Sequence, residues 1–369
     1  FNIMYSRCKM RATQLIVNLN NIKHNIIEIK KYLGNEINIM PIVKSYGYGS
    51  HLNECPEILN EFKYVGVAYL DEAIQLRMNG YENEILILYP LTMEEFEMSK
   101  KYNFILNGSN IFELINDDSK IKIHTEIETG MGRTGLQINK LDDYIKKLKK
   151  NSNIILDGLF THLSTNLDYD FSIKQINLFE QALNEFNKSN FFPDHIHIGS
   201  SGGIQFYKNN LHNMVRIGLL IYGYYPNDSL KNTLKLEPSM LLKTNISYIK
   251  TIGENETVGY NKNFIASKKT VIATIPFGFG DGLLTLETGK PYVIINDTKA
   301  KIIGICMDNM MIDVTEVPNV KLGQEVYIWD NKELTIEELG EWCNGICNYE
   351  VISSISERVP RVLKRRGNI

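Results

Sequence analysis

The sequence predicts an α/β protein in which an N-terminal (β/α)8 TIM-like barrel is followed by a mostly-β C-terminal domain. Over residues 13–230, about eight short apolar runs alternate with helical patterns at a spacing of about 25–30 residues, which favours a closed parallel barrel. After about Pro226 the pattern changes to short β runs between turns rich in Gly, Asn, Asp and Lys. We therefore expect a barrel over 13–230, a β-rich domain over 231–369, and an N-terminal extension or expression remnant at 1–12.

The elements of the first half follow from their apolar periodicity. The first helix, for example, begins at Asn20 as a cap and places Ile22, Ile26, Ile29 and Leu33 on one face. The predicted strands are 13–19, 37–43, 64–68, 84–88, 104–106, 121–127, 154–160 and 195–198, and an apolar segment at 215–222 closes this half. The predicted helices are 20–33, 52–62, 71–79, 93–101, 110–116, 140–150 and 170–188.

The second half contains short β runs without intervening helical patterns. These runs are 244–252, 270–275, 292–295, 301–305, 311–314 and 325–329. Such closely spaced runs between turn residues are typical of an all-β domain.

Composition narrows the class of protein. The chain has 369 residues, of which 43% are hydrophobic, so a sizeable core is available. A net charge of −3 and a pI of about 6.2 argue against nucleic acid or an anionic membrane as the main partner. No apolar run approaches the roughly 20 residues that a membrane span needs.

The cysteines indicate a reducing, cytoplasmic location. The chain has five, Cys8, Cys55, Cys306, Cys343 and Cys347, an odd number scattered along the sequence without a disulfide framework. The last two would share a helix face, but no histidine lies near them in the sequence to complete a zinc site. We therefore expect no bound metal.

The stretch 41–51 carries the clearest chemical signal. Lys44 follows a short apolar run and precedes a loop of two glycines and two tyrosines. Burial lowers the pKa of a lysine and leaves a free amine that can form a Schiff base. Glycine backbone and tyrosine hydroxyls suit an anion, so the stretch suggests pyridoxal 5′-phosphate (PLP) as cofactor. The alternative is a lysine that extends from the strand end into an ordinary turn.

Residues 43–49, Val-Lys-Ser-Tyr-Gly-Tyr-Gly, resemble the cofactor-lysine motif of alanine racemases, which are fold-type III PLP enzymes. Further stretches resemble the family in the same order, namely TGMGRTG at 129–135, THL at 161–163, GSSG at 199–202, VRIGL at 215–219, VGY at 258–260, TIPFGFGDG at 274–282, CMD at 306–308 and the segment 348–361. They span nearly the whole chain, and their joint order carries the resemblance.

The resemblance implies racemisation of L-alanine to D-alanine for peptidoglycan synthesis by two-base proton transfer. Lys44 would form the Schiff base with PLP and then act as acid or base on one face of the substrate. Tyr260 of the partner subunit would act on the other face, in a homodimer with shared active sites. A tyrosine is a poor base near neutral pH, so a cation must lower its pKa, and His162 and Arg216 are the family's matching residues.

The remaining site residues are also implied by the resemblance. Arg216 would face the pyridine nitrogen of PLP and, since it stays protonated, would give it no proton. The family's phosphate-binding positions correspond to Tyr48, Ser201, Gly218 and Tyr349. Arg133 would bind the substrate carboxylate, and Met307, supported by Asp308, would approach the substrate from the partner subunit. Each residue alone also has an ordinary interpretation, such as a packed tyrosine, a core histidine, a rim ion pair or a simple turn.

The sequence departs from the family at three positions. Where many members carry a carbamylated lysine that holds the arginine, this chain has Glu126, which we expect to supply the carboxylate directly; the alternative is a surface glutamate. Phe279 and Thr285 stand where the family has a tyrosine and an arginine, so the substrate corridor would be less polar or wider. Tyr349 favours alanine over serine in the pocket.

Other functions remain open at this point. The corridor changes support a serine or broad-spectrum racemase, and a chain that starts at Phe1 is compatible with the catalytic part of a longer, membrane-anchored protein. A non-catalytic PLP carrier would lack the β domain and Tyr260. A PLP-dependent decarboxylase of the same fold type would carry a cysteine-bearing motif, and Cys343 and Cys347 are not evidently placed that way.

Overall fold

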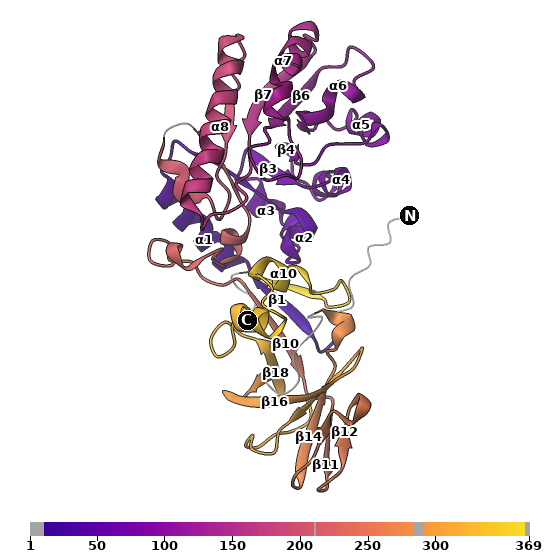
Figure 1. Cartoon of the computed structure of the whole chain (residues 1–369). Coiled ribbons are helices and arrows are strands. Elements are labelled where there is room, and N and C mark those ends of the chain that lie inside the picture. The colour runs from indigo at the N-terminus through magenta and orange to yellow at the C-terminus, as the bar shows by residue number, and fades with distance from the viewer. Residues whose placement is uncertain (1–10, 210–211, 283–290, 366–369) are drawn as a thin grey trace. The chain divides into compact units, whose positions relative to one another are not determined.

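The computed structural model describes residues 11–209, 212–282 and 291–365 (Figure 1). The chain divides into two compact units. The barrel unit contains, of the described residues, 23–47, 51–209 and 212–236. The β unit contains, of the described residues, 11–22, 48–50, 237–282 and 291–365.

Parallel strands close into a ring in the barrel unit. In chain order they are β2 (Asn38–Pro41), β3 (Tyr64–Val67), β4 (Glu84–Ile87), β5 (Leu106–Asn107), β6 (Ile121–Glu126), β7 (Ile154–Phe160), β8 (His195–His197) and β9 (Met214–Ile217). Each described strand pairs in parallel with the next through ladders or single bridges, and β2 pairs with β9, which closes the ring. The predicted (β/α)8 barrel is therefore confirmed.

The helices lie in the connections between strands, as a barrel requires (Figure 1). The α-helices are α1 (Leu19–Leu33), α2 (Lys44–Tyr48), α3 (Pro56–Leu59), α4 (Leu70–Met78), α5 (Met93–Ser99), α6 (Ile111–Leu114), α7 (Leu141–Lys150) and α8 (Tyr169–Lys188). The last of these buries Ile176, Phe179, Leu183 and Phe186 at helical spacing. Among the described residues, no helix is long and apolar enough to cross a membrane.

The β unit is built on a large mixed sheet. Its described strands follow the order β11-β14-β17-β16-β15-β18-β10-β1-β19, in which only the β1–β19 pair is parallel. Their bounds are β1 (Gln14–Asn18), β10 (Met240–Asn245), β11 (Tyr248–Ile252), β14 (Thr270–Ile275), β15 (Tyr292–Ile295), β16 (Thr298–Ile305), β17 (Met310–Asp313), β18 (Glu325–Trp329) and β19 (Arg361–Lys364). A separate hairpin joins β12 (Thr257–Val258) to β13 (Phe264–Ile265), and two helices, α9 (Ile336–Trp342) and α10 (Asn348–Ser353), precede β19.

The first strand differs from the expectation that it belongs to the barrel. β1 pairs with β10 and β19 in the large sheet. Leu15, Ile16 and Val17 are consecutive and buried, which is typical of a strand covered on both faces. That pattern fits a central strand of either domain, so the sequence alone could not assign the strand. The domain boundary near residue 230 stays a prediction.

Several predicted elements are shorter than the sequence suggested. The predicted helix 52–62 is a 3-10 turn followed by α3, because Pro56 begins a new helix at its first position. The predicted run 244–252 consists of two strands, because the chain changes its pairing partner in the middle of the run. Ile246 N–H donates to the carbonyl of Gln324, whereas Ser247 N–H donates to the carbonyl of Thr274. No element was predicted for α9, α10 or β19.

Candidate active site

Six of the predicted site residues lie at one end of the barrel. Lys44, Arg133, His162 and Ser201 follow the carboxyl ends of β2, β6, β7 and β8, while Arg216 and Gly218 lie at the end of β9. Barrel enzymes gather their catalytic groups at this end, because each strand delivers its next residue there.

Lys44 begins an unusual turn directly after β2. Ser45, Tyr46 and Gly47 all have left-handed backbone, with φ of 53°, 53° and 63°. For residues other than glycine this conformation costs roughly 1–2 kcal/mol each, so surrounding contacts must hold the turn. The amine itself forms no hydrogen bond or ion pair within the described part of the chain, and it borders a cavity of about 350 Å³ that Tyr69 and Tyr89 also line.

The electrostatic surroundings of Lys44 favour its neutral form. Burial lowers the pKa of the amine, and the positive charges of Arg133 and Arg216 lower it further, whereas Glu72 raises it. A neutral amine is the form that attacks an aldehyde. The structure therefore supports the chemistry expected of Lys44.

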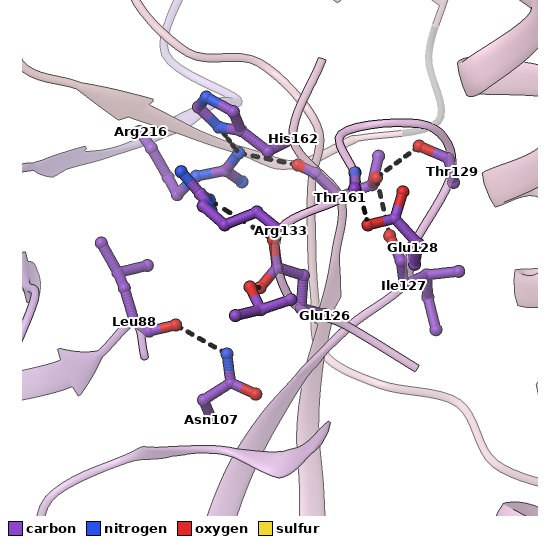
Figure 2. Close-up of polar contacts among 12 residues, drawn as sticks. Leu88, Asn107, Glu126, Ile127, Glu128, Thr129, Arg133, Thr161, His162 and Arg216 are labelled. Carbon is purple, nitrogen blue, oxygen red and sulfur yellow. Dashed lines mark hydrogen bonds and ion pairs between the residues drawn. The ribbon is translucent and has the colours of Figure 1, made fainter. Parts of the chain in front are cut away.

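Arg216 is buried, with 4% of its surface exposed, and both of its terminal nitrogens have hydrogen-bond acceptors. Nη1 donates to the Nδ1 atom and the carbonyl of His197, each at 2.8 Å. Nη2 donates to the carbonyls of Thr161 at 2.7 Å and Ile198 at 3.3 Å, and lies 3.3 Å from His162 Nδ1 (Figure 2). Burial lowers its pKa to about 10, so the side chain stays a cation at neutral pH.

A chain of hydrogen bonds leads from Arg216 through the barrel interior to a carboxylate. His197 Nε2 lies 2.8 Å from His124 Nδ1, and His124 Nε2 lies 2.9 Å from Asp157 Oδ2. Arginine only donates and an ionised carboxylate only accepts, so the ends fix every proton in between. His197 and His124 are both protonated on Nε2, and burial lowers the pKa of both rings so that they stay neutral.

His162 is also a neutral ring. Burial, followed by the charges of Arg216 and Arg133, lowers its pKa to about 3. Of the two residues expected to supply a cation near the catalytic tyrosine, Arg216 is therefore the one that carries the charge.

Arg133 lies on the loop after β6 and is held by Glu126 at the end of that strand (Figure 2). Arg133 Nη2 lies 3.5 Å from Glu126 Oε1, and Thr134 Oγ1 donates to Glu126 Oε2 at 2.5 Å. Glu126 is 2% exposed, so the surface-glutamate interpretation was wrong. The guanidinium also lies over the ring of Tyr89, 5.3 Å from its centroid.

The expected phosphate-binding residues form two pairs, one in each unit. In the barrel unit, Gly218 N–H donates to Ser201 Oγ at 3.0 Å. In the β unit, the rings of Tyr48 and Tyr349 lie 5.8 Å apart between centroids. The structure thus brings each pair together within its own unit.

Tyr260, Met307 and Asp308 lie in the β unit. Tyr260 is 67% exposed and follows Gly259, whose φ of 78° suits glycine. The Tyr260 turn is adjacent to β16, which leads to Met307, because a Cβ on Gly304 would lie 3.6 Å from the Gly259 Cα. Met307 is 55% exposed, and its neighbour Asp308 accepts a 2.6 Å hydrogen bond from Arg358.

The corridor positions are only partly described. Phe279 is exposed, and its N–H donates to the carbonyl of Cys306 beside Met307. Thr285 lies outside the described residues. Among the residues that the structure covers, no group of three or more His, Cys, Asp or Glu side chains could hold a metal ion.

The charges at the barrel end fit PLP. Lys44, Arg133 and Arg216 influence one another electrostatically, with buried Glu126 as the carboxylate beside them. The Lys44 amine has no hydrogen-bond or ion-pair partner among the described residues, and a surplus of positive charge around it suits an aldehyde that carries a phosphate, together with a substrate carboxylate. Ser201 and Gly218 would hold the phosphate from the same unit. The fold and this arrangement are those of a PLP-dependent enzyme of the barrel class.

Comparison with known proteins identifies the family. The alanine racemase N-terminal domain model matches residues 17–226, and the C-terminal domain model matches residues 239–363. Alanine racemase 1 of Clostridium acetobutylicum is 35% identical over 371 residues, covering 96% of this chain and 95% of the relative. The chain belongs to the alanine racemase family, whose members depend on PLP.

Solved structures agree with this assignment. An alanine racemase from Clostridium difficile superposes with a TM-score of 0.90 at 31% identity, covering 96% of each chain. A Bacillus anthracis alanine racemase with bound L-Ala-P superposes with a TM-score of 0.88 at 28% identity, covering 97% of this chain and 96% of that one.

The sequence did not single out the residues that support the site. His124, His197 and Asp157 hold Arg216 through hydrogen bonds, and Glu72 contacts the Lys44 turn. The alternation His-Ile-His at 195–197 was one available signal, because both histidines of a strand then face the same side. Whether that side is the barrel interior or the barrel exterior depends on how the strands close into a ring.

Glu126→Gln should weaken substrate binding, because Arg133 loses the ion pair that holds it. We expect the KM for alanine to rise roughly tenfold, as for loss of a charged hydrogen-bond partner, with PLP content unchanged. Steady-state racemisation assays measure this. Glu113→Gln, an exposed glutamate of α6, is the control, and an unchanged KM in Glu126→Gln would contradict the assignment.

His212 allows a pH-dependent test of the buried histidines. The ring is 4% exposed, and neither nitrogen has a hydrogen-bond partner among the described residues. Burial, followed by the charge of Arg216, lowers its pKa from 6.5 to about 4. Because the pKa of His212 is lower in the folded protein, the unfolded chain takes up the proton at a higher pH than the folded protein does. The contribution of the neutral His212 ring to the free energy of unfolding is therefore complete above pH 6.5 and is lost as the pH falls toward 4.

His212→Leu should consequently resist acid better than the wild type. With these pKa values, the wild type loses about 2 kcal/mol more free energy of unfolding between pH 7 and pH 5. Urea unfolding at both pH values measures the difference. Leu15→Ala, in the core of the β unit, should shift stability equally at both, and an identical acid loss in wild type and His212→Leu would refute the prediction.

Proposed function

We propose that this protein interconverts L-alanine and D-alanine with PLP attached to Lys44. The observation that carries the proposal is the set of charges at the barrel end, where the Lys44 amine, with its lowered pKa, lies under the influence of Arg133 and Arg216. Membership of the alanine racemase family along nearly the whole chain supports alanine as substrate.

Two side chains exchange the substrate's Cα proton from opposite faces. PLP, when bound, supplies an electron sink that makes this proton acidic enough to remove. Lys44 gives or takes the proton on one face, which its lowered pKa favours. Tyr260 of the partner subunit serves the other face. Arg216 would hold the pyridine nitrogen of PLP. Because Arg216 stays a cation near neutral pH, it would give that nitrogen no proton.

The remaining site residues bind and orient the substrate and the cofactor. Arg133 takes the substrate carboxylate, and Glu126 fixes that arginine at 3.5 Å. Ser201 and Gly218 hold the phosphate from the barrel unit, with Tyr48 and Tyr349 as further phosphate contacts and His162 beside Arg216. Met307, whose neighbour Asp308 is fixed by Arg358, limits the substrate pocket from the partner subunit.

We propose a homodimer with shared active sites. Tyr260 and Met307 are both more than half exposed on the β unit, as expected of residues that serve a second copy. We also propose a cytoplasmic location, because the sequence has an odd number of scattered cysteines without a disulfide framework. There the product D-alanine would supply peptidoglycan synthesis.

Two alternatives are testable in the same assay. The exposed Phe279 in the corridor favours a serine or broad-spectrum racemase, whereas Tyr349 favours alanine. A non-catalytic PLP carrier is opposed by the β unit that carries Tyr260. Chiral chromatography after incubation of the PLP-loaded protein with L-alanine or L-serine separates these functions.

We expect rapid formation of D-alanine and little D-serine. Tyr260→Phe should reduce kcat by about 10²–10⁴-fold, the usual contribution of a general acid or base, with PLP still bound. Tyr248→Phe removes another exposed tyrosine hydroxyl of the β unit and should change nothing. Comparable or faster D-serine formation would reassign the substrate, and no D-isomer of either would leave a PLP carrier.

A further inference from the structure

The left-handed turn after Lys44 must be held in place by its surroundings. Ser45 and Tyr46 are not glycines, yet both have φ of 53°, and both side chains are exposed. Side-chain packing on these two residues is therefore limited. Backbone hydrogen bonds hold the later part of the turn, where Gly47 N–H donates to the carbonyl of Val43 and His51 N–H donates to the carbonyl of Tyr46, each at 2.8 Å.

One carboxylate reaches the near side of the turn. Glu72 Oε1 accepts a 2.6 Å hydrogen bond from the N–H of Ser45, the residue directly after Lys44. Glu72 Oε2 accepts from the N–H groups of Ala68 at 2.7 Å and Tyr69 at 3.3 Å. The side chain therefore joins the Lys44 turn to the end of β3 and the beginning of α4.

Both oxygens of this carboxylate are used, which distinguishes it from an ordinary helix cap. Glu95 has the same position in α5, where its Oε2 accepts from the N–H and hydroxyl of Thr92 at 2.8 and 2.9 Å. Both glutamates cap a helix, whereas Glu72 also binds Ser45. A glutamine at position 72 would offer a single oxygen for the two sides and present an NH₂ group to the other donors.

We propose that Glu72 is a positioning residue for the cofactor lysine. Its carboxylate holds Ser45 in the left-handed conformation and thereby fixes where the Lys44 side chain leaves the barrel, at the cavity that both residues line. The inference rests on the proposed function in one respect, since it takes Lys44 as the residue that binds PLP.

The test compares Glu72→Gln with Glu95→Gln, which removes the matched cap remote from Lys44. The apoprotein is titrated with PLP by absorbance, and the Schiff base is then reduced with borohydride and its position mapped by peptide mass spectrometry. We expect Glu72→Gln to raise the Kd for PLP about tenfold or more and to reduce the fraction trapped at Lys44. Glu95→Gln should change the Kd less than about twofold, while both lower the Tm similarly.

A rescue variant distinguishes two possible roles of Glu72, which are to hold the backbone of the turn and to supply a negative charge near Lys44. Glycine adopts the left-handed region without strain, so Ser45→Gly in the Glu72→Gln background should restore most of the trapping at Lys44. If Glu72→Gln does not fold, Glu72→Asp replaces it, because the shorter side chain can still cap α4 but does not extend to Ser45.

Two results would overturn the proposal. One is equal PLP binding and trapping in the Glu72 and Glu95 variants, and the other is a defect that Ser45→Gly leaves unchanged. A wild type that traps PLP at Lys44 but does not racemise alanine would overturn the proposed function instead, and the comparison between variants would still decide the role of Glu72.

Discussion

The buried guanidinium of Arg216 is the constraint on which the barrel interior depends. An unpaired charge removed from water is very costly, and this one has no carboxylate in direct contact among the described residues. Three backbone carbonyls accept from it directly, and two neutral imidazoles connect it to Asp157. Four barrel strands, β6 to β9, thus share one polar network that fixes a cation at the end where the site lies.

The same cation sets the acid–base properties of its neighbours. After burial, it is the largest contributor to lowering the pKa of His162, and it contributes, after burial and Arg133, to lowering the pKa of Lys44. Glu126 opposes this surplus of positive charge beside Arg133 and raises the pKa of Arg216. Two arginine cations beside one buried carboxylate leave a site that attracts an anionic cofactor and keeps its lysine reactive.

The sequence predicted the architecture and the chemical groups, but not the contacts that hold them. The spacing of apolar runs predicted the barrel, and the order of short family-like motifs pointed to Lys44, Arg133 and Arg216 as site residues. The place of β1 was not predictable, because three consecutive buried apolar residues fit the centre of either domain. His124, Asp157 and Glu72 were missed for a related reason, since a polar residue on a strand or helix gains its role only when closure brings distant strands together. The roles assigned to the site residues remain proposals.

Histidine-selective ¹⁵N NMR tests the central claim of a directed hydrogen-bond chain most directly. The sequence has seven histidines, so the signals of His124 and His197 can be assigned with single substitutions. At pH 7 the account predicts that both rings are neutral and carry their proton on Nε2, as required between an arginine donor and a carboxylate acceptor. An imidazolium at either position, or a proton on Nδ1 of His197, would contradict it.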